Sequence, residues 1–447
     1  MADRESWATR VGFILASIGS AVGLGNIWRF PFQTATNGGA AFLLVYLVAV
    51  VLIGIPAILA EFVIGRRANL NAIDAFDRLN FPRWKVVGGL GILGGFWVLS
   101  YYSVIGGWVI RYVLGSVQGS YLDAPSEYFG AISAGPEAIA FHALFMLLTV
   151  AIVAFGVERG IELATKFMVP SIVVLMLGIA AYAVTLSGAG EGYAFFLSPD
   201  IDQLLANIES VIPAAVGQAL FSLSLGFSVM ITYASYIGDD ENLGVDGTVI
   251  AIFNTFVGIL AGLVVFPLLF AQGVPPDTAG PGAIFISIPT ALADIPAGQV
   301  VGLVFFGVVL IASLSSAISL LEVVTSYIID HYDVSRAGTA AGLGGIIFVL
   351  GLPSAWRTPW LSWFDGMAVN LYLPVAVLLV VVFVGWQFAG EALDEIRQGT
   401  SVSESSLLAP MWLWSLRTIV LVAVFGTLLL GIWELYTPAD AYFVPPL

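Results

Sequence analysis

A run of glycines and polar residues interrupts the first apolar stretch of the chain. It reads Gly-Ser-Ala-Val-Gly-Leu-Gly-Asn-Ile-Trp-Arg-Phe-Pro over residues 19–31. Glycine and proline weaken helices, and a break inside a membrane leaves backbone N–H and C=O groups that lipid cannot satisfy. Freed N–H groups at the start of a half-helix attract anions, and freed carbonyls at the end of one attract cations. The run therefore predicts a site for a zwitterion and a small hard cation.

A second interruption, Gly-Gln-Ala-Leu-Phe-Ser-Leu-Ser-Leu-Gly-Phe over residues 217–227, follows about 200 residues later. Broken helices in corresponding positions of two halves indicate a transporter site near the membrane midplane. A separate cluster, Ala312, Ser315 and Ser316, places oxygen atoms suited to sodium on one helical face. Serines in membrane helices usually bond to the preceding turn, so this cluster taken alone favours a structural role.

The composition is that of a membrane protein. Hydrophobic residues make up 59% of the chain and charged residues 10%, and the mean hydropathy is +0.98. Soluble domains carry about 25% charged residues. Eleven apolar stretches reach the roughly 20 residues needed to cross a bilayer: 11–36, 40–65, 86–118, 138–155, 161–185, 209–236, 246–271, 298–329, 337–353, 364–390 and 413–436.

These stretches predict an all-α integral membrane protein with about 11 transmembrane helices. We expect a single transporter domain over residues 1–447, built as a five-plus-five inverted repeat (about 8–185 and 205–390) with discontinuous helices 1 and 6. An additional helix would cover about 413–436, after a polar loop at 390–410. The distribution of arginines predicts a plasma-membrane (inner-membrane) protein with a cytoplasmic N-terminus and an extracellular C-terminus.

The charge balance is unusual, because the net charge is −15 with almost no lysine. Acidic, lysine-poor surfaces suit proteins that work in concentrated salt, and we predict a halophilic source. The absence of cysteine excludes disulfides and thiolate metal sites. The expected partners are the lipid bilayer and a small-molecule substrate, with no nucleic acid. The oligomeric state stays undetermined.

Charged residues within membrane-spanning stretches are costly and usually mark functional sites. Arg29 follows the first break and Asp365 opens the tenth stretch from the outside, so this pair is predicted to form an outer gate. Arg4 and Asp330 lie at cytoplasmic ends and are predicted to form an inner gate. Glu61 needs a partner, for which the unwound backbone near residues 224–226 is the candidate. No nucleophile–base pair, metal-ligand cluster or charged pore ring indicates an enzyme or a channel.

Several long strings in this chain resemble the neurotransmitter:sodium symporter family, most closely its bacterial leucine-transporter branch. They are WATRVGFILASIGSAVGLGNIWRFPF, NGGAAFLLVY, GIPAILAEFVIGR, VGQALFSLSLGFSVMITYASY and SLSSAISLLEVVTSYIID. The resemblance implies sodium-coupled uptake of an amino acid by alternating access, with two sodium ions.

The resemblance also implies three groups of site residues. Sodium site one corresponds to Ala21, Asn26, Ser222 and Asn254, completed by the substrate carboxylate, and sodium site two to Gly19, Val22, Ala312, Ser315 and Ser316. The substrate pocket corresponds to Ser20, Ala21, Gly25, Val98, Tyr102, Phe221, Ser222, Ser224, Phe227, Ser316 and Leu320. Tyr102 would bond the carboxylate and Phe221 would cover the pocket. The half that would hold the side chain has no charge, which predicts a neutral, hydrophobic amino acid.

Chloride is a further candidate ligand. In chloride-dependent relatives the anion site is built from positions like Tyr46, Gln218, Ser222 and Asn254 plus a serine one turn later, where this chain has Gly258. Chloride dependence therefore stays open. Two alternatives to sodium symport also stay open: a proton-coupled amino acid transporter and a non-transporting amino acid sensor on the same fold. Neither predicted cation site contains the titratable group that proton coupling would need.

Overall fold

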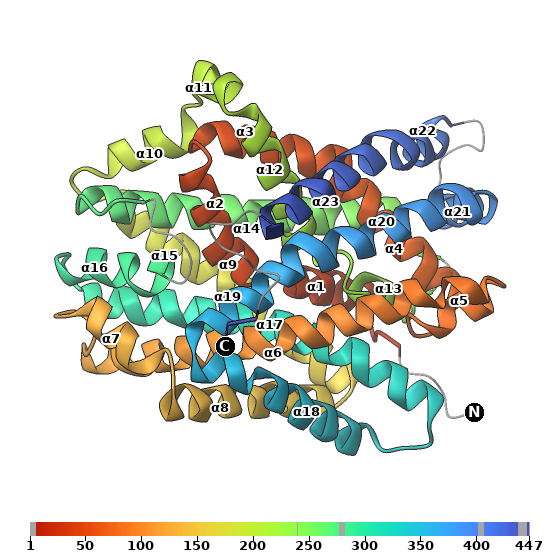
Figure 1. The fold of residues 1–447 in the computed structure, drawn as a ribbon, viewed down its shortest axis with the longest axis horizontal. Helices are drawn as coiled ribbons and strands as arrows, with labels where there is room; N and C mark the ends of the chain where they lie inside the picture. The colour runs from red at the N-terminus through yellow and green to blue at the C-terminus, as the bar shows by residue number, and fades with distance from the viewer. Residues whose placement is uncertain (1–5, 239, 277–281, 401–405, 437–444, 447) are drawn as a thin grey trace.

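The computed structural model describes residues 6–238, 240–276, 282–400, 406–436 and 445–446, and every regular element within them is a helix (Figure 1). Nine helices in these ranges are long and apolar enough to cross a membrane, and the bent pair at residues 10–36 makes a tenth. With the interrupted stretch that begins at Ile208, they match the eleven predicted stretches. The predicted all-α membrane architecture is confirmed.

The first five spans contain the following helices: α1 (Arg10–Ala21), η1 (Gly25–Arg29) and α2 (Phe30–Thr36); α3 (Ala40–Ala49), η2 (Val50–Gly54) and α4 (Ile55–Ala68); α6 (Lys85–Gln118); α8 (Pro136–Ala154); η4 (Val157–Glu162) and α9 (Leu163–Ala183). The next five contain α12 (Ile208–Ser222) and α13 (Val229–Ala234); α14 (Leu243–Ala271); α17 (Gly298–His331); α18 (Arg336–Trp356); α19 (Thr358–Met367), η5 (Ala368–Tyr372), α20 (Leu373–Val382) and η6 (Phe383–Gln387). The eleventh contains α22 (Leu408–Ser415), η7 (Leu416–Val420) and α23 (Leu421–Tyr436). Short helices connect them: α5 (Asp74–Arg78), η3 (Pro82–Trp84), α7 (Pro125–Ile132), α10 (Ala189–Leu197), α11 (Ile201–Ala206), α15 (Gly282–Phe285), α16 (Ser287–Ala293) and α21 (Ala389–Arg397).

Both predicted breaks are present. After α1 the backbone of Val22 is extended, with φ −79° and ψ 100°, and the helix axis turns by 49° between α1 and the segment formed by η1 and α2. In the second break Ser224, Gly226 and Ser228 have φ values of 54°, 78° and 58°. The left-handed region disfavours residues with a side chain, so the two serines hold a conformation that the surrounding packing must enforce.

The region 390–410, predicted as a loop, is in part helical. It contains most of α21 and the start of α22. Glu395 and Ile396 of α21 are buried, and the Glu395 carboxylate pairs with the buried guanidinium of Arg66 at 2.5 Å. The short helix has a polar composition because its exposed face is charged, which hid it from a hydropathy-based assignment. The tenth and eleventh spans also begin earlier than predicted, at Thr358 and Leu408.

The elements position both breaks near the middle of the molecule (Figure 1). In Figure 1, α7, α10 and α16 gather at one end of the bundle, and α5, α21 and α22 at the other. The long helices α6 and α17 run beside each other past the breaks. A site formed at the breaks is therefore enclosed by the two longest helices of the fold.

Candidate functional site

A small cavity of about 30 Å³ lies where the two breaks meet α6 and α17. Its lining consists of Ser20, Ala21, Gly23, Gly25, Val98, Tyr102, Phe221, Ser224, Phe227, Ser316 and Leu320. Ten of the eleven residues predicted for the substrate pocket are in this set. The exception is Ser222, which lies beside the cavity without lining it, and Gly23 lines it without having been predicted.

One half of the cavity is polar, because the first break frees backbone groups there. The N–H of Leu24 donates to the hydroxyl of Tyr102 at 3.2 Å. The carbonyl of Ser20 accepts hydrogen bonds from the hydroxyls of Ser224 and Ser316, each at 2.9 Å. Residues from α6, α17 and the second break thus share the polar groups of the first break.

The other half of the cavity is apolar. Val98, Phe227 and Leu320 are buried, with exposed fractions of 2%, 5% and 6%. No lining residue carries a charge. A charged side chain placed here would lose its hydration without gaining a partner, at a cost of several kcal/mol. The chemistry of the lining therefore favours an apolar side chain over a charged one.

Two glycines allow α17 to approach the first break. A Cβ atom added at Gly19 would lie 2.3 Å from the hydroxyl oxygen of Ser315. A Cβ atom added at Gly23 would lie 2.2 Å from the hydroxyl oxygen of Ser316 and 2.8 Å from the hydroxyl oxygen of Tyr102. Sequence reasoning missed Gly23 as a site residue. Its signal was its place in the glycine-rich run at residues 19–31, since glycine allows close approach of the backbone to other groups.

The residues predicted for the first cation site lie together. Asn26 Nδ2 donates to Asn254 Oδ1 at 2.8 Å. The Asn254 amide group can take two orientations. In one, its nitrogen donates to the carbonyl oxygens of Ala21 at 3.2 Å and Ser222 at 3.0 Å. In the other, which accepts the bond from Asn26, its side-chain oxygen faces these two carbonyl oxygens, and a cation bound among the three oxygens would stabilise that arrangement.

The residues predicted for the second cation site lie along the contact between α1 and α17. Ser316 Oγ is 3.5 Å from the carbonyl oxygen of Val22, and Ser315 Oγ lies against Gly19. The Ser315 hydroxyl is buried and has no hydrogen-bond partner within the described residues. Ala312, one turn earlier on α17, is fully buried. Leaving a buried hydroxyl without a hydrogen-bond partner costs free energy, and a bound cation would provide the Ser315 oxygen with a partner.

Three of the four residues considered for an anion are in contact. The hydroxyl of Ser222 is 3.1 Å from that of Tyr46 and accepts from Asn254 Nδ2 at 3.3 Å. Gln218 instead donates to the carbonyl of Gly25 at 2.8 Å. A Cβ at Gly258 would lie 3.6 Å from the Phe30 ring, which is an ordinary contact distance.

On the side predicted to be outer, Arg29 and Asp365 form an ion pair at 3.7 Å. Tyr101, which sequence reasoning missed, donates to Asp365 Oδ1 at 2.9 Å. The guanidinium carbon of Arg29 lies 5.2 Å from the centre of the Phe221 ring. The predicted outer gate pair is therefore in contact directly above a residue that lines the cavity.

Of the predicted inner gate, Arg4 lies outside the described residues. Asp330 accepts from Asn71 Nδ2 at 3.3 Å. Other residues near the N-terminus hold the start of α1: Trp7 Nε1 donates to the Tyr233 carbonyl at 3.0 Å. The string before the first span contained this tryptophan, but its type alone did not identify a partner.

Arg10 provides a second connection at the same end. Its guanidinium pairs with Asp246 at 2.6 Å and with Glu241 at 2.8 Å. Partial burial raises the pKa of Glu241, and the positive charge of Arg10 opposes that shift. Arg10 therefore joins α1 to the loop before α14 and to the start of α14.

The second break is held by Glu61, as predicted. Glu61 Oε1 accepts from the backbone N–H of Gly226 at 2.7 Å, and Glu61 is 1% exposed. The carboxylate replaces the carbonyl partner that a continuous helix would provide.

Comparison with known proteins gives one consistent result. The model of the "Sodium:neurotransmitter symporter family" matches residues 4–123 and 134–442. The uncharacterized sodium-dependent transporter YhdH of Bacillus subtilis is 35% identical, over 94% of this chain and 95% of that protein. The human sodium-dependent neutral amino acid transporter SLC6A17 is 26% identical, over 86% of this chain and 67% of that protein. The crystal structure of MhsT in complex with L-phenylalanine is 41% identical with a TM-score of 0.87, covering 96% of this chain and 100% of that one.

Proposed function

Because the chain belongs to the sodium:neurotransmitter symporter family, we propose that it takes up neutral, hydrophobic amino acids by sodium-coupled symport. Its family and fold are those of transporters rather than enzymes. The observation that carries the substrate assignment is the cavity at the two breaks, which has a polar half, an apolar half and no charged lining residue. SLC6A17 is named as a neutral amino acid transporter and MhsT holds L-phenylalanine, which supports the same substrate class.

We propose two sodium sites. Ala21, Asn26, Ser222 and Asn254 would form the first together with the substrate carboxylate, which would couple the ion directly to the substrate. Gly19, Val22, Ala312, Ser315 and Ser316 would form the second between α1 and α17. The approach of Asn254 to two carbonyl oxygens and the unpaired hydroxyl of Ser315 support these assignments.

Transport would proceed by alternating access in a plasma-membrane protein with a cytoplasmic N-terminus and two inverted repeats, about 8–185 and 205–390. The Arg29–Asp365 pair would close the outer side. On the inner side, the contacts of Trp7 and Arg10 would have to separate before α1 could move away from α13 and α14.

The test is binding of radiolabelled leucine and phenylalanine to the purified protein, with sodium replaced by potassium at constant ionic strength and chloride. We expect binding to require sodium. Asn26→Ala and Ser315→Ala should each raise the sodium concentration for half-maximal binding by tenfold or more. Ser171→Ala removes an exposed hydroxyl that bonds only to the preceding turn, and should leave this concentration unchanged.

Three results would contradict parts of the proposal. Binding that is indifferent to sodium but depends on pH would favour proton coupling. Sodium-dependent binding without uptake into proteoliposomes would favour a sensor. Uptake of charged amino acids in preference to leucine would overturn the substrate class. Replacing chloride by gluconate in the same assay decides whether an anion is needed.

A further inference from the structure

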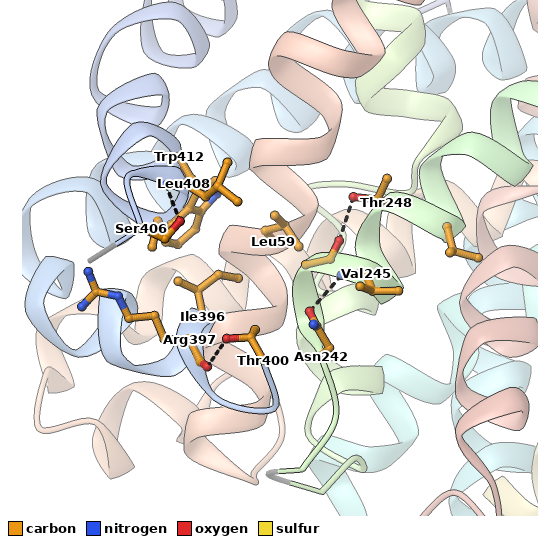
Figure 2. A pocket seen from close by; sticks show the side chains of 13 residues that line it. Leu59, Asn242, Val245, Thr248, Ile396, Arg397, Thr400, Ser406, Leu408 and Trp412 are labelled. Atoms are coloured by element: carbon orange, nitrogen blue, oxygen red, sulfur yellow. Dashed lines mark hydrogen bonds between the residues drawn. The ribbon is translucent and has the colours of Figure 1, made fainter. Parts of the chain in front are cut away.

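A groove separate from the cavity at the breaks opens between α4, α14, α21 and α22. Its volume is about 490 Å³. Figure 2 shows Leu59, Ile396 and Trp412 around it, with Val245 and Thr248 on the facing side. A cavity of this size is in the range that holds drug-sized ligands, and neither proposed sodium site nor the proposed substrate site includes any of its lining residues.

The groove lies on the outer flank of helices that are long and apolar enough to cross a membrane. Its walls come from α4, α14 and α22, which belong to three spans capable of crossing a membrane. Val245, Val249 and Leu408 are 48%, 40% and 67% exposed. Large exposed aliphatic side chains on membrane-crossing helices contact lipid. The groove is near the first turns of α14 and α22, at the end of the bundle that carries Arg66 and Arg397.

The polar side chains of the groove are already hydrogen-bonded to nearby backbone. Figure 2 shows four such bonds. Two are made by hydroxyls that donate to carbonyls: Thr248 to Gly244 at 2.7 Å and Thr400 to Arg397 at 2.7 Å. In the other two a side-chain oxygen accepts from a backbone N–H: Asn242 from Val245 at 3.1 Å and Ser406 from Leu408 at 3.3 Å. The indole N–H of Trp412 donates to the Pro56 carbonyl at 3.0 Å. With its polar groups engaged in this way, the groove presents mainly hydrocarbon to an occupant.

Arg397 is the cationic residue of the groove. In Figure 2 its side chain extends away from Val245 and Thr248, toward the outer rim. Within the described residues its guanidinium makes no ion pair. A basic side chain at the end of a membrane-crossing bundle is placed to meet lipid phosphates.

From the apolar interior and the cationic rim we infer that the groove binds one phospholipid of the leaflet on the side of Arg66 and Arg397. An acyl chain would occupy the space between Leu59, Val245 and Trp412. The headgroup phosphate would lie at Arg397. This site does not depend on the proposed substrate or ions.

The experiment uses the full chain in vesicles of a zwitterionic phospholipid that contain a small fraction of an anionic phospholipid with brominated acyl chains. Bromine quenches tryptophan fluorescence on contact, so quenching reports which lipid touches each indole. Trp412 lines the groove and is 8% exposed, whereas Trp414 on the same helix is 61% exposed and does not line it. We expect quenching above that predicted by the mole fraction of brominated lipid, and its loss in Trp412→Phe but not in the matched control Trp414→Phe.

Two further variants test the two parts of the site. Ala409→Leu narrows the groove while retaining every tryptophan, and should reduce the excess quenching. Arg397→Gln should lower the preference for anionic over zwitterionic brominated lipid by about fivefold, the effect of one basic residue near a lipid surface. Quenching of Trp412 that only follows the mole fraction, or an excess that persists in Ala409→Leu, would overturn the site. A headgroup preference unchanged in Arg397→Gln would overturn the role of Arg397.

Discussion

The hydroxyl of Ser224 donates a hydrogen bond to the carbonyl oxygen of Ser20 at 2.9 Å, which joins the two helix breaks directly. Each break leaves polar backbone groups that need partners, and here one break supplies a partner for the other. Ser316 of α17 donates to the same carbonyl. A movement of either break relative to α17 must therefore change these shared contacts, which is how binding in the cavity would influence the arrangement of the helices.

Gly19→Ala should weaken sodium binding, because the added Cβ would lie 2.3 Å from Ser315 Oγ and would separate α1 from α17. Overpacking of this kind costs about 1–3 kcal/mol, so we expect the sodium concentration for half-maximal substrate binding to rise about tenfold. Gly178→Ala is the control, since nothing lies within 4 Å of its Cβ position. Equal behaviour of the two variants would contradict the second sodium site.

Glu61→Leu should destabilise the protein, because the Gly226 N–H would lose its buried acceptor. The expected cost is about 1–3 kcal/mol, measured as a lower midpoint of thermal unfolding. Glu61→Gln keeps a side-chain oxygen that can accept the bond seen at 2.7 Å and should retain most of the stability. If both variants unfold at the same temperature, the charge of Glu61 matters more than its hydrogen bond.

Asp365→Asn should speed substrate release to the outer side. The Arg29–Asp365 pair is partly exposed, with side-chain exposures of 19% and 26%, and such pairs contribute about 1 kcal/mol or less. We therefore expect a measurable rise in the rate of substrate dissociation, up to about fivefold. Glu137→Gln, which breaks the Arg111–Glu137 pair elsewhere in the bundle, should not change this rate. An unchanged rate in Asp365→Asn would argue against an outer gate.

Glu395→Leu should strongly destabilise the protein, because it leaves the fully buried guanidinium of Arg66 without its carboxylate. Removing one partner of a buried pair costs about 3–5 kcal/mol. Glu391→Leu alters an exposed residue of the same helix and should change the free energy of unfolding by about 0.5 kcal/mol or less. Denaturant unfolding of both variants in one detergent checks this expectation.

Salt should stabilise the protein, because its net charge is −15. Repulsion between exposed carboxylates is screened over about 10 Å at 0.1 M salt and over about 3 Å at 1 M. We expect the midpoint of thermal unfolding to rise as potassium chloride increases from low to molar concentrations. An unfolding temperature that is independent of salt would contradict the predicted halophilic source.

The sequence by itself determined the membrane class, the number of spans and the two breaks, because these depend on the hydropathy and on local glycine and proline chemistry. It also identified Glu61 as a residue in need of a partner, since an acid within an apolar stretch is costly wherever it lies. It missed α21, because a short amphipathic helix has no apolar run and is stabilised by the distant contact between Arg66 and Glu395.

Tertiary structure alone decided which polar groups meet. Nothing local to Ser224 or Ser316 indicates that both hydroxyls donate to the carbonyl of Ser20, and nothing local to Tyr101 indicates its bond to Asp365. The partners in these three hydrogen bonds are 204 to 296 residues apart in the chain, and their meeting depends on how whole helices pack. The local sequence determines where a helix breaks and leaves backbone N–H and C=O groups without partners. The packing of helices distant in the chain determines which groups then hydrogen-bond to them.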